Sequence, residues 1–220
     1  MFQWLLYFAL VLGLFPLSIL LIKKKAAIKT PFIFPFLLVV FVASLYEGLA
    51  TILLEVPTIL WFRVYLLLEF LALAYYFYYL LKKRFKFFFS FLVFSYCILF
   101  VLLIPSLYDG HNLLADAYLS IFEVVFVYIG IIIWVKDTFR ELSEESMLHI
   151  PHFYFISGFL MYFSGTLFLY LMGDIFLYSS SISFESYWNL NIIFNIILRL
   201  FLIAGAWKMK KAAVPPEAGT

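Results

Sequence analysis

The part of the sequence that decides the fold is the uncharged run from Phe87 to Ile104, FFFSFLVFSYCILFVLLI. This run is apolar on every face, whereas a barrel strand would alternate apolar and polar residues over about ten positions. An α-helix that rises about 1.5 Å per residue needs roughly twenty apolar residues to cross about 30 Å of hydrocarbon. The run therefore predicts a membrane-spanning helix.

Similar apolar blocks fill most of the chain on both sides of this run. The predicted helices cover residues 2–22, 31–54, 58–81, 87–106, 113–135, 152–173 and 186–207. Apolar residues make up 66% of the chain and charged residues 13%, about half the charged fraction of a soluble globular domain. We therefore expect an all-α membrane protein, with one seven-helix transmembrane domain over residues 1–211 and a disordered tail over residues 212–220.

The distribution of basic residues predicts the orientation of the bundle. Cytoplasmic loops accumulate Lys and Arg. Of the 15 basic residues, all except Arg63 and Arg199 fall in the first, third, fifth and seventh breaks between the predicted helices. This alternation predicts that the N-terminus lies outside and the C-terminus lies in the cytoplasm.

Three of the predicted helices carry polar residues at spacings of three or four. These spacings place each set on one helical face. The sets are Ser44, Glu47, Thr51 and Glu55 in the second helix, Asp116, Ser120 and Glu123 in the fifth, and Asn191, Asn195 and Arg199 in the seventh. A charge within the hydrocarbon costs at least about 2.5 kcal/mol, so ionisable residues at such depth are candidates for function.

Depth along the helices separates these candidates. Glu69 and Glu123 both lie roughly 17 Å from the outer face, near the membrane midplane. Each must be protonated, paired with a cation or exposed to a wet cavity. Arg199 lies about 12 Å from the cytoplasmic end, which favours an ion pair with Glu123 or Glu69. A second pair is expected between Arg63 and Glu47, which both lie in the outer third.

The polar residues have two interpretations. They could be interhelical contacts worth about 0.6 to 2 kcal/mol each, which fix how the helices pack. The convergence of three polar faces on one bundle favours the second interpretation, a polar cavity that binds a ligand or ion. The candidate residues for this cavity are Glu47, Arg63, Glu69, Asp116, Glu123, Asn191, Asn195 and Arg199.

Motifs for a metal or an organic cofactor are not expected. His149 and His152 are predicted at the cytoplasmic end of the sixth helix, about 30 Å across the membrane from His111, so the three cannot share one zinc ion. No histidine pair for haem is predicted within the membrane. The seventh helix has no lysine for a retinal Schiff base, because the first is Lys208 at its boundary. No cofactor, catalytic residue or nucleic-acid partner is therefore predicted.

Two segments predict packing or docking. In the fifth break, Phe139, Met147 and Ile150 share one face, which predicts either a solvated extension of the fifth helix or an amphipathic helix that docks a partner. In the sixth helix, Ser157-Gly158 and Ser164-Gly165 form a strip of small residues that lets a neighbouring helix approach closely.

The last third of the chain carries a family resemblance. The run PHFYFISGFLMYFSGTLF, from Pro151 to Phe168, and the residues from Asn195 to Trp207 resemble a family of uncharacterised seven-helix membrane proteins common in Bacteroidota. The stretch from Arg63 to Lys83, with Glu69 inside it, is similar to the third helix of the same family. The resemblance implies a bacterial inner membrane and brings no established activity.

Three functional classes follow from the sequence. The preferred one is a ligand-sensing or receptor-like module that binds a small molecule and signals through a separate cytoplasmic or membrane partner. The second is a small-solute or proton-coupled transporter, to which the midplane carboxylates are equally suited. The third is a lipid-modifying enzyme, for which the sequence shows no catalytic constellation.

Overall fold

The computed structural model describes residues 2–24, 32–54, 56, 59–81, 85–108, 113–141, 147–178 and 184–209. Seven helical spans in these ranges are long and apolar enough to cross a membrane, which confirms the all-α prediction. The elements are α1 (Phe2–Lys24), α2 (Phe34–Tyr46), the π-helix η1 (Glu47–Leu53), α3 (Ile59–Leu80), α4 (Lys86–Tyr108), α5 (Leu113–Glu141), the short 3₁₀ helix η2 (Met147–His149), α6 (Pro151–Tyr178) and α7 (Phe184–Lys208).

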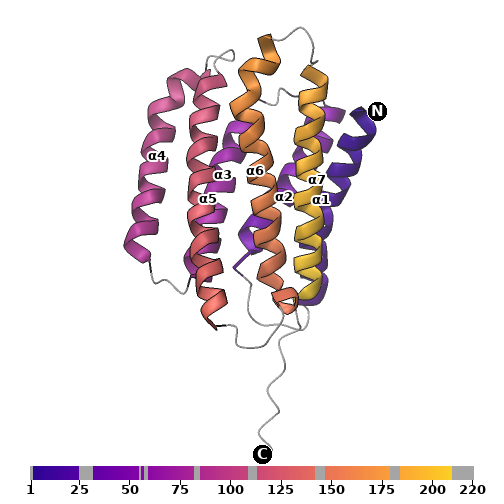
Figure 1. The fold of residues 1–220 in the computed structure, drawn as a ribbon. Helices are drawn as coiled ribbons and strands as arrows, with labels where there is room; N and C mark the ends of the chain where they lie inside the picture. The colour runs from indigo at the N-terminus through magenta and orange to yellow at the C-terminus, as the bar shows by residue number, and fades with distance from the viewer. Residues whose placement is uncertain are drawn as a thin grey trace, which may run out of the picture.

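The helices stand side by side in one bundle, with α4 at one flank and α1 at the other (Figure 1). Helix α7 packs against both α6 and α1, α2 packs against α1 and α3, and α5 packs against α3, α4 and α6. Lys23, Lys86, Arg140 and Lys208 lie near the end of the bundle where α1, α3, α5 and α7 finish. We call this the basic end.

Contacts at the basic end hold α1 against α7. The Lys23 ammonium donates hydrogen bonds to the carbonyl oxygens of Trp207 and Met209, and it lies 5.0 Å from the centroid of the Trp207 ring. A cation at a helix C-terminus satisfies carbonyl groups that have no partner within their own helix. The two ends of the chain's helical part are therefore joined to each other.

The small-residue strip of α6 is the place where α7 approaches most closely. A Cβ atom on Gly165 would lie 2.3 Å from the ring of Phe194, and one on Gly158 would lie 2.8 Å from the Cβ of Phe201. Both distances are shorter than van der Waals contact, so the glycines are needed for this packing. The structure agrees with the prediction that the strip serves helix packing.

The second span departs from the regular α-helix predicted over residues 31–54. From Glu47 onward it is a π-helix, in which the Leu54 amide donates to the Leu49 carbonyl over 3.2 Å, five residues back. Because a π-turn is wider than an α-turn, the α-helical spacing used to place Thr51 on the same stripe as Glu47 is wrong for this segment. Glu55 lies outside the described residues.

Helix α5 is longer than the sequence indicated. It runs to Glu141 rather than to residue 135, so the first part of the fifth break, with Phe139 exposed, continues the helix. Residues 142–146 and the predicted tail over 212–220 lie outside the described residues.

The half of the bundle nearer the basic end is filled with aromatic rings. Phe159 contacts Phe36 of α2 edge-on at 4.9 Å between ring centroids, and it lies 5.7 Å from Tyr76 of α3. Phe126 of α5 lies 6.1 Å from Phe77. We call the fully buried rings of this region the aromatic layer; they are Phe36, Tyr76, Phe77, Phe126, Phe155 and Phe159.

Candidate functional site

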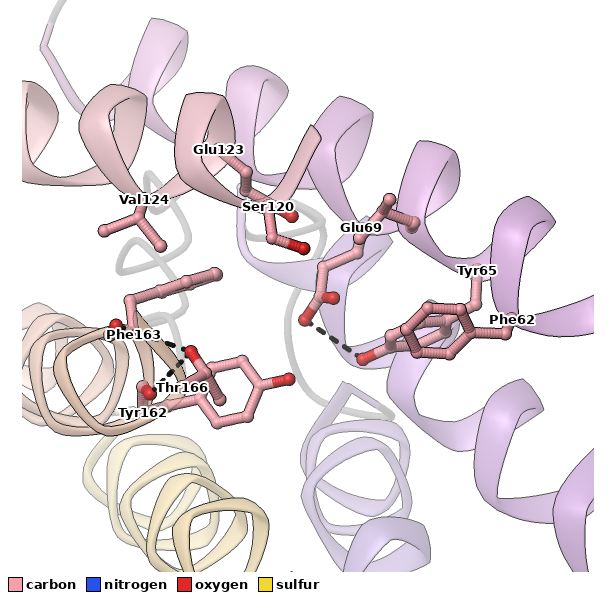
Figure 2. Close-up of a pocket in the computed structure, with 10 residues that line it drawn as sticks. Phe62, Tyr65, Glu69, Ser120, Glu123, Val124, Tyr162, Phe163 and Thr166 are labelled. Carbon is pink, nitrogen blue, oxygen red and sulfur yellow. Dashed lines mark hydrogen bonds between the residues drawn. The ribbon is translucent and has the colours of Figure 1, made fainter. Parts of the chain in front are cut away.

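Two acidic side chains from different helices meet at mid-bundle. Glu69 of α3 is 3% exposed and Glu123 of α5 is 1% exposed. Both line one cavity of about 30 Å³, in which the Glu69 carboxyl group is turned toward the Tyr65 hydroxyl and Glu123 comes from the facing helix α5 (Figure 2). Helix α6 closes the opposite wall with Phe163 and Thr166. The structure therefore brings together the two residues that depth along the helices placed near the midplane.

The hydroxyl groups around the cavity are oriented by hydrogen bonds. The Tyr65 hydroxyl, one turn before Glu69 on α3, donates to the Glu69 Oε1 atom over 3.0 Å. The Thr166 hydroxyl donates to the carbonyl oxygen of Tyr162 over 3.0 Å. Because the Thr166 hydrogen is used within its own helix, the Thr166 oxygen presents lone pairs to the cavity.

Two buried atoms of the cavity have no hydrogen-bond partner within the described part of the chain. They are the Ser120 Oγ atom and the Glu123 Oε1 atom, which lie one turn apart on α5. A buried polar atom without a partner costs about 1 to 3 kcal/mol, and more for a charged group. The carboxyl and hydroxyl oxygens give the cavity more hydrogen-bond acceptors than donors, and the Ser120 hydroxyl is a donor that stays available.

Arg199 lies beside the cavity and not in its wall. It is 7% exposed, and its strongest electrostatic neighbour is Glu47, with Glu69 also close enough to act on it. Its Nη1 atom has no hydrogen-bond partner among the residues that the structure describes. The charge that acts on Glu123 comes from Glu69 rather than from Arg199. Of the two pairings predicted for Arg199, the structure thus favours the one with Glu69 over the one with Glu123, and it adds Glu47 as a further electrostatic neighbour.

A glycine on α1 makes room for the Arg199 guanidinium. A Cβ atom on Gly13 would lie 3.3 Å from the Arg199 Cζ atom and 2.0 Å from the Ser44 Oγ atom. Any larger residue at this position would displace one of these side chains. Helices α1, α2 and α7 are therefore shaped locally around a buried cation.

The other candidate residues lie away from this centre. Arg63 is half-buried, and within the described part of the chain it forms no ion pair with Glu47, whose electrostatic partner is Arg199. The Asn195 side-chain amide donates to the Asn191 carbonyl oxygen over 3.2 Å, within its own helix. Asp116 belongs to the first turn of α5, and its side chain lies outside the described residues. The second predicted ion pair is therefore not formed.

Sequence reasoning missed four residues of this region. Tyr65 precedes Glu69 by four residues and Tyr162 precedes Thr166 by four, so helical spacing alone indicates that each pair shares a face. Gly13 is different, because nothing in the sequence of α1 indicates which glycine faces a buried arginine. It could be found only from the packing of three helices.

A second buried polar contact lies in the aromatic layer. The Tyr76 hydroxyl and the His152 Nδ1 atom are 3.0 Å apart, and Tyr76 is fully buried. His149 is exposed, and His111 lies outside the described residues. In the described part of the chain no three His, Cys, Asp or Glu side chains are grouped as metal ligands.

Comparisons with family models, with curated proteins and with solved structures found no match. The class of the protein therefore rests on its fold and on the chemistry of its buried residues. Its described residues form a bundle of seven helices of membrane-spanning length and composition, with two buried carboxyl groups at its centre.

Proposed function

We propose that the protein is a proton-coupled membrane transporter in which Glu69 and Glu123 take up and release the proton. The observation that carries this proposal is the burial of both carboxyl groups against one cavity, with the Glu123 Oε1 atom unpaired. Two carboxylates that share a low-dielectric site cannot both stay ionised without a compensating positive charge. A proton is the smallest charge that meets this need.

The volume of the cavity supports a proton or water rather than an organic ligand. A cavity of about 30 Å³ holds one or two water-sized occupants, since each needs about 10 to 15 Å³. Sites for organic ligands typically measure about 300 to 1,000 Å³. This difference favours transport over the receptor-like function that the sequence placed first, while the receptor and lipid-enzyme hypotheses stay predictions.

The position of the aromatic layer supports one end of the bundle as the side from which protons reach Glu69 and Glu123. Phe126 lies one turn beyond Glu123, and Phe77 lies two turns beyond Glu69, both toward the basic end. These packed rings separate the carboxyl pair from that end, so protons would enter from the opposite end in this conformation. With the basic end in the cytoplasm of a bacterial inner membrane, as the loop charges and the family resemblance predict, the site would face outward.

Transport can be tested with purified protein in liposomes that contain a pH-sensitive dye. After a pH gradient is imposed across the membrane, a panel of small solutes is added one at a time, and internal pH is recorded. We expect at least one solute to accelerate proton movement in the native protein. We expect Glu69→Gln and Glu123→Gln to reduce this movement to the level of empty liposomes, because an amide cannot carry a proton between the two sides.

The matched control is Asp137→Asn, which makes the same chemical change on α5 but near the basic end. It should keep the native flux. Absence of flux with every solute in the native protein, or native flux in both glutamine variants, would contradict the proposal. A partner protein that consistently copurifies from native membranes and responds to an added ligand would support the receptor hypothesis instead.

A further inference from the structure

The cavity between α3, α5 and α6 offers oxygen atoms beyond those that proton exchange requires. Besides the carboxyl groups of Glu69 and Glu123, it is lined by the hydroxyl groups of Ser120 and Thr166. The Ser120 Oγ atom is buried and has no partner, and the Thr166 oxygen has already donated its hydrogen to α6. A proton binds to one carboxyl oxygen and needs no such set of neutral oxygens around it, whereas hydroxyl oxygens are ligands of the kind that hard cations take.

The charges around the cavity also call for a cation. Four charged groups lie in or beside the cavity: the carboxyl groups of Glu69 and Glu123 line it, and the Arg199 guanidinium beside it interacts with Glu47 and Glu69. With all four groups ionised their sum is −2, since three negative charges meet one positive charge. One bound proton and one monovalent cation would bring the cluster to neutrality within the hydrocarbon, where net charge is costly.

We propose that the cavity binds a sodium ion through Glu69, Glu123, Ser120 and Thr166. This inference rests on the proposed transport function and names the ion that would accompany or replace the proton. The size fits, because a volume of about 30 Å³ admits a cation stripped of its water shell.

A divalent ion fits less well. Magnesium keeps several of its waters and needs octahedral geometry, for which a cavity of one or two water volumes has no room. Calcium takes six to eight oxygen ligands, more than this lining supplies without both carboxylates binding through both oxygens. An anion is disfavoured because acceptor atoms outnumber free donors in the wall.

The site can be tested by thermal unfolding of the full chain in detergent, followed by intrinsic tryptophan fluorescence. Samples contain sodium chloride or choline chloride at equal ionic strength, at pH 8.5 and at pH 5.5. We expect sodium to raise the Tm by about 3 °C or more at pH 8.5, because a ligand that binds only the folded state stabilises it. At pH 5.5 the shift should shrink, because protons compete for the same carboxylate oxygens.

Two variants locate the effect. Glu123→Gln should abolish the sodium shift, and the double variant Ser120→Ala with Thr166→Val should reduce it while both carboxylates stay in place. The matched controls are Asp137→Asn and the pair Ser95→Ala with Thr138→Val, which lie outside the cavity and should keep the full shift. Where Glu123→Gln unfolds on extraction, the double variant and its control carry the test.

The outcomes separate this inference from the transport proposal, because binding is measured without any flux. No difference between sodium and choline, an equal shift in the cavity variants, or a shift produced by calcium or magnesium and not by sodium would overturn the sodium site. Proton flux measured in choline buffer would still stand in each of those cases. Absence of flux together with a sodium shift would instead overturn transport and leave the binding site.

Discussion

The two halves of the bundle differ in how completely their buried groups are satisfied. In the half near the basic end, the aromatic layer packs ring against ring, and Tyr76, its one fully buried hydroxyl group, contacts His152. Outside this layer, six buried polar atoms in the described part of the chain have no partner, and five of them lie at mid-bundle or toward the opposite end. The six atoms belong to Thr51, Trp61, Ser120, Glu123, Asn189 and Arg199.

This difference indicates which half stabilises the fold and which half is available for chemistry. Lipid is as apolar as a buried ring, so membrane helices gain stability from close packing rather than from escape from water. The aromatic layer supplies that packing. The unpaired atoms around Glu123 and Arg199 do the opposite, because each costs free energy in the folded state. Groups that are costly to bury and have no structural partner are best explained by a function.

Because close packing is concentrated in the half near the basic end, we expect the substitution with the largest loss of stability to lie in the aromatic layer. Phe159 is fully buried and contacts rings from both α2 and α3. Phe159→Ala should lower the free energy of unfolding by roughly 3 kcal/mol, because it leaves a cavity that the surrounding rings cannot fill. The measurement is reversible unfolding in mixed detergent micelles. Phe91→Ala, at an exposed ring of α4, is the control and should change little.

A smaller loss of stability is expected where a methyl group is added to the tightly packed aromatic layer. A Cβ atom on Gly130 would lie 2.6 to 2.8 Å from three ring carbons of Phe77, which is itself fully buried. Gly130→Ala should cost about 1 to 3 kcal/mol through overpacking, even though alanine favours helix formation. Gly48→Ala is the matched control, since its new Cβ would meet only Leu10 at 3.9 Å. Equal stability of the two variants would show that the Phe77 ring moves freely.

The same contrast explains what the sequence could and could not predict. The lengths of the apolar blocks predicted the seven spans, because the thickness of a bilayer fixes how many residues a helix needs. Depth counting placed Glu69 and Glu123 at one level, since the rise per residue is constant. It could not supply the rotation of each helix about its axis, so it left Glu123 and Glu69 as equal partners for Arg199 and did not indicate Glu47. The π-helix from Glu47 was also missed, because hydropathy does not report hydrogen-bond register.

One hydrogen bond tests whether the buried polar pair of the aromatic layer is structural. Tyr76→Phe removes the hydroxyl group that lies 3.0 Å from the His152 Nδ1 atom and keeps the ring contacts with Phe155 and Phe159. The expected loss is about 1 kcal/mol, the typical net contribution of one hydrogen bond, measured by the same unfolding assay. Tyr118→Phe, at an exposed ring, is the control. A loss of transport without a loss of stability would instead move this pair into the proton path.

The smallest change in stability is predicted at the most buried acidic residue of the centre. Glu123→Gln keeps the shape of the side chain, and it removes a carboxyl group whose Oε1 atom has no partner. In choline buffer the free energy of unfolding should therefore stay within about 1 kcal/mol of the native value or rise, because the folded state no longer buries an unpaired acid. A loss comparable to that of Phe159→Ala would show that the carboxylate makes a structural bond, and the contrast between the halves would fail. If Glu123→Gln is as stable as the native protein but does not transport protons, then Glu123 is needed for its carboxyl group and not for helix packing.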